Sequence, residues 1–123
     1  MAGDVGATKV DLAVFAPREG IRAPLAQVTL QAACYPSFEV LVSQFLAQVD
    51  LCVDRAVFAA AGPVVGDRVT ITNMPWEVDG ARVRERLGLS SVVLLNDLEA
   101  TALAVPLLRP TDLHTLHAGH PTP

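Results

Sequence analysis

The chain has 123 residues, of which 51% are hydrophobic and 18% charged, and its formal net charge is −4. This composition predicts one folded domain with a buried core and excludes a disordered chain. The negative charge argues against nucleic acid or an anionic membrane as a partner, and no apolar run approaches the ~18 residues that a membrane span needs.

The first third of the chain predicts three strands. Met1–Val5 is a short first strand, and apolar residues then alternate with polar or small ones in Lys9–Ala16 and again in Leu25–Ala33. This period of two is typical of strands. Because only short turns connect the three segments, they predict an antiparallel meander.

The loop between the first two strands has two interpretations. Its sequence is Gly3-Asp4-Val5-Gly6-Ala7-Thr8-Lys9. Glycine lets the backbone approach a ligand closely and Thr8 offers a hydroxyl donor, so the loop could cradle a phosphate. It matches neither the Walker nor the dinucleotide-binding motif. A β-hairpin turn is at least as well supported by the sequence, and it is compatible with phosphate binding.

A helix and a buried strand are predicted next. Ser37 is positioned to cap a helix that continues through Val49, with apolar residues at helical spacing. The apolar run in Asp54–Ala61 then predicts a buried strand that ends in a tight turn at Gly62–Pro63.

An irregular hairpin follows this turn. Arg68–Asn73 predicts a further strand, and the only tryptophan of the chain comes shortly after it. Asp79 is positioned to cap a short helix that ends at Gly88, because Asp favours helix starts and Gly favours helix ends.

The last regular elements surround a pair of polar residues. Val92–Leu95 is a run of four aliphatic residues, which predicts a strand buried on both faces of a parallel sheet. Leu98–Leu108 predicts a helix that packs on this sheet. Asn96 and Asp97 lie between them, where ligands bind in open α/β sheets. Both are also preferred capping residues, and Asn96 with Glu99 resembles a capping box, so a purely capping role stays open.

The segment from Arg109 onward predicts an exposed connection. Three prolines and a glycine interrupt it, and no periodicity survives. His114, His117 and His120 are spaced by three residues, but Gly119 and the proline after His120 argue against a helix that would gather them around a metal ion.

The cysteines and the N-terminus predict a cytoplasmic protein. Cys34 and Cys52 are far apart in sequence and form no metal-ligand pair, so we interpret both as reduced thiols. Met1-Ala2-Gly3-Asp4 begins no basic and apolar segment of the kind that signal peptides have.

Four motifs, in sequence order, resemble the bacterial glucokinases of the ROK and glucokinase group. Gly3–Lys9 resembles their first phosphate loop, and Ala60–Val64 resembles their small-residue strand end. Thr72–Trp76 resembles the segment that lines the sugar cleft, and Leu95–Ala100 the motif with the catalytic base. Asp112–Pro123 is similar to the connection that precedes the second phosphate loop.

The resemblance implies a fold and a domain organisation. The fold is α/β, a ribonuclease H-like half-domain of the actin-like ATPases, with three antiparallel and then two parallel strands and helices on the sheet. Residues 1–108 are expected to form the small N-terminal domain. Residues 109–123 are expected to lead toward a missing C-terminal domain that carries the second phosphate loop.

The resemblance also implies a function. It points to a glycolytic, ATP-dependent hexose kinase that transfers the γ-phosphoryl of ATP to the 6-hydroxyl of glucose or a similar hexose, with Mg²⁺. This chain alone is expected to be inactive. A non-catalytic sugar-binding or interaction module, or a related sugar kinase with a different acceptor, stays open, as does a homodimer.

The roles of single residues follow from the same resemblance. Asp97 is expected to act as the general base, and Asp4 to help hold Mg²⁺ through water. Ala7 stands where the family usually has a second glycine, so its methyl group is expected to restrict the approach of phosphate. The remaining expected contacts are Asn96, Asn73 and Thr72 with the sugar, and Asp4, Gly6, Ala7, Thr8 and Lys9 with the nucleotide and its metal.

Overall fold

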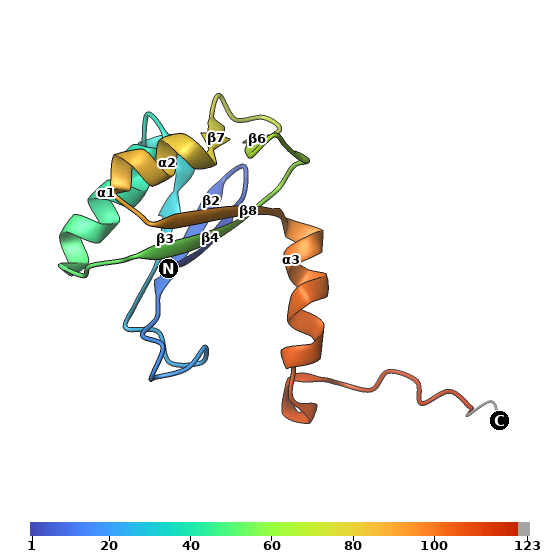
Figure 1. Cartoon of the computed structure of the whole chain (residues 1–123). Helices are drawn as coiled ribbons and strands as arrows, with labels where there is room; N and C mark the ends of the chain where they lie inside the picture. The colour runs from blue at the N-terminus through green and yellow to red at the C-terminus, as the bar shows by residue number, and fades with distance from the viewer. Residues whose placement is uncertain (121–123) are drawn as a thin grey trace.

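A mixed five-stranded sheet forms the centre of the computed structural model, which describes residues 1–120 (Figure 1). Its strand order is β3-β2-β1-β4-β8. β1 pairs antiparallel with β2 and parallel with β4, and β4 pairs parallel with β8. The expected sheet, with β3 at one edge and β1 inside, is therefore confirmed. The strands are β1 (Ala2–Val5), β2 (Lys9–Val14), β3 (Ala26–Gln31), β4 (Arg55–Ala60) and β8 (Ser91–Asn96).

The irregular hairpin expected after Gly62–Pro63 is a second, antiparallel sheet of three short strands, and the strand predicted over Arg68–Asn73 ends at Thr70. The sheet contains β5 (Val64–Val65), β6 (Arg68–Thr70) and β7 (Glu77–Asp79). After β4 the chain passes very close to β6 at Gly62. A Cβ atom at this position would lie only 2.7 Å from the Thr70 carbonyl oxygen. Only glycine therefore fits at this turn.

Two helices cover one face of the main sheet, α1 (Phe38–Val49) and α2 (Gly80–Leu87) (Figure 1). Their predicted caps are confirmed. The Ser37 hydroxyl accepts the Val40 N–H at 3.3 Å, and Asp79 Oδ1 accepts the Arg82 N–H at 3.1 Å. Gly88 ends α2 with a left-handed φ of +64°, a conformation that costs glycine little.

The hydrophobic core lies between these helices and the sheet. Phe38 of α1 and Phe58 of β4 are fully buried and meet edge to face, with ring centroids 4.9 Å apart. Gly3 leaves room for this pair, because a Cβ atom there would lie 2.7 Å from the Phe58 ring. Val5, Val10 and Leu12 are among the other main-sheet residues in this core.

The other face of the sheet is uncovered, and here the sequence-based expectation was wrong. β4 and β8 were expected to be buried on both faces, but Val57 is 41% exposed and Val93 is 43% exposed. Both helices pack on the opposite face, and β8 is an edge strand. The apolar run therefore marks a surface that lacks a covering element in the described chain.

The last helix, α3 (Asp97–Ala104), also departs from the expectation (Figure 1). It extends away from the sheet and has no buried residue. The predicted helix to Leu108 instead ends at Ala104, and a 3-10 turn, Val105–Leu107, continues it. Its alanines and leucines surround the helix axis, so no single apolar face directs it onto the sheet.

The connection after α3 is exposed in all its described residues, as expected, and its last three residues lie outside the described chain. Arg22 ties it back to the β2–β3 loop through a 2.5 Å ion pair with Asp112. Cys34 and Cys52 are free and exposed. Among residues 1–120, no helix combines the length and the apolar character that crossing a membrane requires.

Candidate active site

Asp4 and Asp97, predicted from separate motifs, come together at one end of the main sheet. Asp4 lies in β1, and Asp97 directly follows β8, at the carboxyl ends of strands that are both parallel to β4. Partial burial raises the pKa of the Asp4 carboxyl, and the negative charges of Asp11 and Asp97 raise it further. The three carboxyl groups therefore lie within electrostatic reach of one another.

Asp11 is a member of this group that the sequence analysis missed. It stands directly opposite Asp4 on the neighbouring antiparallel strand, so both side chains lie on the uncovered face of the sheet. The Thr29 hydroxyl of β3 donates a hydrogen bond to Asp11 Oδ1. The sequence contained a signal for Asp11, because the tight turn after Val5 fixes the strand register and thereby places Asp11 opposite Asp4.

Asn96 joins three segments at the end of β8. Its Nδ2 donates to the Gly62 carbonyl oxygen at 2.9 Å, and its Oδ1 accepts the Leu98 N–H at 3.0 Å. The capping interpretation is thus confirmed for Asn96. The suggested capping box is not formed in this way, because the cap bonds Leu98 rather than the N–H of Glu99.

Asp97 is the first residue of α3 rather than its cap. Its Oδ1 accepts the Leu98 N–H at 2.9 Å, and its backbone carbonyl accepts the Thr101 hydroxyl at 2.9 Å. Within residues 1–120 we find no hydrogen bond to Oδ2. The carboxylate is therefore held by the helix start while one oxygen stays available to a ligand.

The loop between β1 and β2 is a hairpin turn, which confirms one of its two interpretations. The Gly6 N–H donates to the Lys9 carbonyl oxygen at 3.0 Å, and the Ala32 N–H donates to that of Thr8 at 2.9 Å. Ala7 is exposed, and its φ lies outside the left-handed region, so alanine causes no backbone strain there. Thr8 and Lys9 are exposed as well.

Thr72 and Asn73 lie in the turn that follows β6. Asn73 has a left-handed φ of +63°, and the Met74 N–H closes the turn onto the Ile71 carbonyl oxygen at 3.1 Å. In the described part of the chain neither residue bonds to Asn96 or Asp97. Their link to the site is indirect, through the Gly62 turn that packs against β6.

The donors at this end of the sheet suit a hard divalent cation bound partly through water. Mg²⁺ takes oxygen ligands, keeps several waters and commonly uses one or two carboxylates. Among the described residues, no ion pair engages Asp4, Asp11 or Asp97, so their charge is uncompensated. However, no group of three or more side chains in residues 1–120 has the geometry of a direct metal site.

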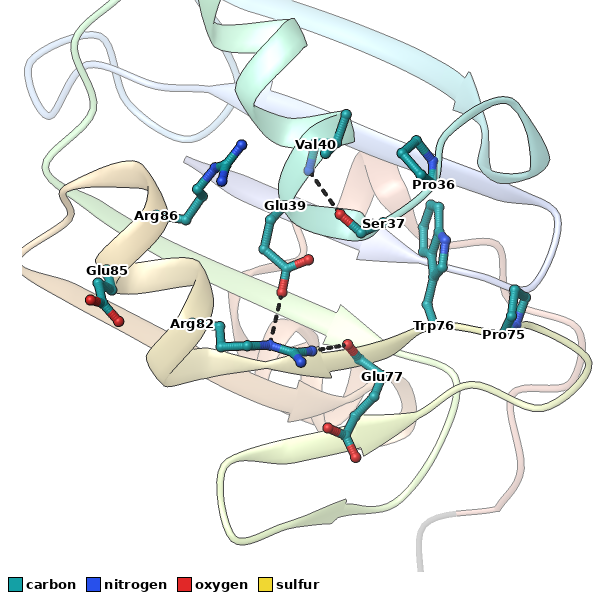
Figure 2. A pocket seen from close by; sticks show the side chains of 10 residues that line it. All are labelled: Pro36, Ser37, Glu39, Val40, Pro75, Trp76, Glu77, Arg82, Glu85 and Arg86. Carbon is teal, nitrogen blue, oxygen red and sulfur yellow. Dashed lines mark hydrogen bonds and ion pairs between the residues drawn. The ribbon is translucent and has the colours of Figure 1, made fainter.

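A separate cavity of about 670 Å³ opens on the helix side of the domain (Figure 2). It lies between the first turn of α1, the segment at Trp76 and α2. Arg82 crosses its wall, with Nε 3.3 Å from Glu39 Oε1 and Nη2 donating to the Glu77 carbonyl oxygen at 2.8 Å. None of the predicted site residues lines this cavity.

Comparison with known proteins identifies the family. The family model described as Glucokinase matches residues 1–123. The chain belongs to the glucokinase family. Glucokinase from Nostoc punctiforme is 32% identical over 126 residues, a match that covers 100% of this chain and 37% of that protein. Glucokinase from Yersinia enterocolitica is also 32% identical, over 100% of this chain and 38% of its own length. The chain thus spans little more than a third of these glucokinases.

Solved glucokinase structures share the fold. A glucokinase from an Antarctic psychrotroph superposes with a TM-score of 0.78 at 24% identity, over 89% of this chain and 35% of its own. A ROK family glucokinase from Streptomyces griseus, solved in complex with glucose and AMPPNP, gives a TM-score of 0.58 at 26% identity, over 81% of this chain and 33% of its own. The expected actin-like ATPase fold is therefore confirmed.

Proposed function

We propose that this chain is the N-terminal part of a cytoplasmic hexose kinase that transfers the γ-phosphoryl of ATP to the 6-hydroxyl of glucose. The observation that carries the proposal is the meeting of Asp4 with Asp97 at the carboxyl ends of β1 and β8. Such an end of an α/β sheet is where ligands bind. The Streptomyces griseus relative, bound to glucose and AMPPNP, supports the choice of sugar and nucleotide.

Asp97 acts as the general base in this proposal. The Leu98 N–H holds Asp97 Oδ1 in place. Asp97 Oδ2 accepts the proton of the sugar hydroxyl while the hydroxyl oxygen attacks phosphorus. The position at the start of a helix, directly after a strand, makes a rigid mount for this oxygen. Phosphoryl transfer depends chiefly on such positioning and on charge neutralisation.

In this proposal Asp4 would hold Mg²⁺ through water, and the ion would supply charge neutralisation for the phosphates. The uncompensated charge of Asp4, Asp11 and Asp97 supports a cation at this place. The hairpin turn faces the nucleotide, with the Thr8 hydroxyl and the backbone around Gly6, Ala7 and Lys9 beside the phosphates.

Asn96, Thr72 and Asn73 contact the sugar in this proposal. Asn96 uses both polar groups of its side chain inside the protein, so it also positions Asp97 by fixing the start of α3 against Gly62. Thr72 and Asn73 are exposed on the turn after β6 and approach the sugar from the second sheet.

The rest of the site comes from outside this chain. We propose that residues 1–108 form the small domain and that 109–123 lead to a C-terminal domain that closes the cleft. A one-sided site neither excludes water nor clamps ATP. The 123-residue chain alone is expected to show no turnover in a coupled glucokinase assay and to bind glucose no better than millimolar.

The experiment uses a chimera, in which the 123 residues are fused to the part of the Nostoc punctiforme glucokinase that follows the matched region. Glucose-dependent ADP formation is expected from the chimera. Asp97→Asn keeps the acceptor for the Leu98 N–H, so the melting temperature should change little while kcat falls roughly 10²-fold or more. Near-full kcat in Asp97→Asn would show that Asp97 is not the base. Asp97→Ala, which also loses the acceptor, separates a loss of stability from a loss of catalysis.

A further inference from the structure

The cavity on the helix side of the domain has two unlike walls (Figure 2). One wall is formed by the rings of Pro36, Pro75 and Trp76. The other wall is helix α2, which presents the charged side chains of Arg82 and Arg86. A volume of about 670 Å³ lies within the range of small-molecule sites. Such sites usually combine an apolar lining with a few polar groups that fix the ligand, and both are present here.

Glu39 lies between these walls, in the first turn of α1. It is only 8% exposed, and within residues 1–120 neither oxygen of its carboxylate accepts a hydrogen bond. The buried Oε1 lies 3.3 Å from Arg82 Nε, whereas Figure 2 shows the other oxygen directed away from Arg82. Buried polar groups in folded proteins are nearly always hydrogen-bonded, and an exception indicates a missing partner. Glu39 Oε2 is therefore an acceptor for a donor that enters the cavity.

The charges around the cavity indicate the class of ligand. Its lining holds the carboxylates of Glu39, Glu77 and Glu85 and the guanidinium groups of Arg82 and Arg86. This mixture disfavours a charged ligand, because an anion would meet the carboxylates and a cation would meet the guanidinium groups. A hydroxyl group both donates and accepts, so a neutral polyol can hydrogen-bond to both kinds of side chain. The ring wall suits the apolar C–H face of a cyclic polyol.

We propose that this cavity binds a small neutral sugar of the monosaccharide class. Its hydroxyl groups donate to Glu39 and accept from Arg86, while its apolar face lies against the wall at Trp76. In the described part of the chain Arg86 takes part in no ion pair, so its guanidinium is available to the ligand. The site is distinct from the proposed kinase site, whose residues do not line this cavity. The inference needs no nucleotide, metal ion or second domain, so it does not depend on the proposed function.

Trp76 provides the readout, because it is the only tryptophan and lies in the cavity wall. The 123-residue chain is titrated with methyl glucoside, a neutral probe, while the fluorescence of Trp76 is followed. A saturable change is expected with a Kd in the millimolar range, as is usual for a small ligand held by few hydrogen bonds. Saturation-transfer NMR of the probe measures the same binding without the indole. No saturable binding in either measurement up to about 100 mM would overturn the inference.

Two substitutions test whether the probe occupies the cavity. Glu39→Gln keeps the size of the side chain and removes its charge, so the Kd should rise about tenfold. Arg86→Gln should also raise the Kd, and because Arg86 is exposed this variant stays folded even if Glu39→Gln does not. Arg84→Gln is the matched control, since Arg84 lies on the same helix, is exposed and does not line the cavity. If Arg86→Gln or a folded Glu39→Gln binds as the wild type does, the probe lies elsewhere and the inference is wrong.

Charged probes with the same sugar ring test the class of ligand. Glucuronate and glucosamine should both bind more weakly than methyl glucoside at neutral pH. Tighter binding of either one would show that the cavity selects an anion or a cation, and would overturn the proposed class.

A last variant separates this inference from the proposed function. Asp97→Asn should leave the titration with methyl glucoside unchanged, because Asp97 does not line the cavity. Weaker binding in this variant would place the probe at the proposed kinase site, which would overturn the inference and support that site. Failure of the chimera to phosphorylate glucose would count against the kinase assignment alone.

Discussion

The side chain of Asn96 makes two bonds that substitutions can separate. Asn96→Ser keeps a capping oxygen for the Leu98 N–H but is too short to reach the Gly62 carbonyl, which now takes the amide at 2.9 Å. Losing that bond should lower the free energy of unfolding by about 1 kcal/mol. Asn96→Ala loses the capping oxygen as well, but Asp97 Oδ1 still accepts the Leu98 N–H at 2.9 Å, so the total loss is about 1–2 kcal/mol.

The assay is urea unfolding of the 123-residue chain, followed by the fluorescence of Trp76. This residue is the only tryptophan and is 5% exposed, so its emission should change on unfolding. The expected order of stability is wild type, then Asn96→Ser, then Asn96→Ala, with a similar slope against urea throughout. If Asn96→Ser unfolds at the wild-type midpoint, the bond to Gly62 contributes nothing, and Asn96 does not fix the start of α3 in the way inferred here.

Three further predictions follow from the contacts. Gly3→Ala should cost about 1–3 kcal/mol in the same urea assay, because its Cβ would lie 2.7 Å from the buried Phe58 ring; a stability equal to that of the wild type would contradict the packing described. The Arg82 N–H, with Arg68 nearby, lowers the pKa of the Asp79 carboxyl below 3.8, so the stability it contributes is present above that pH and is lost as pH falls through the lowered pKa. Asp79→Asn should therefore make the free energy of unfolding less dependent on pH as the pH falls below 3.8, and an unchanged pH dependence would assign acid unfolding to other groups. Ala7→Gly in the chimera should lower the KM for ATP without changing kcat, as steady-state kinetics would show, and an unchanged KM would mean that the alanine methyl does not restrict the phosphate.

The sequence predicted correctly those features that depend only on residues close together in the chain. Alternation in β2 placed Val10, Leu12 and Val14 on the buried face, and the structure confirms this placement. The cap at Ser37 and the helix end at Gly88 were also confirmed, because a side-chain acceptor and a left-handed φ depend only on nearby residues. The parallel pairing of β4 and β8 was predicted from their unbroken apolar runs, and the structure confirms it.

Features that depend on distant surfaces were not predictable in the same way. The apolar sequence of β8 indicates that Val93 avoids water, but not whether this chain provides the cover. The same limit explains α3, which was correctly predicted as a helix and wrongly placed on the sheet. At the site, motifs found Asp4 and Asp97 separately. Asp11 emerged only from cross-strand register, which depends on the geometry of a turn.

The origin of the two main site residues has a kinetic consequence. Asp4 comes from the first strand of the chain, whereas Asp97 follows β8, the last strand of the main sheet. The β1–β2–β3 meander needs only local contacts and is available early in synthesis, while β8 joins the sheet through β4 alone. The two carboxylates therefore meet only when the last strand docks. The effect of Asp97 on the pKa of Asp4 therefore marks the completion of this sheet. A pause before β8 would leave a largely folded domain that lacks the Asp97 carboxylate at its site.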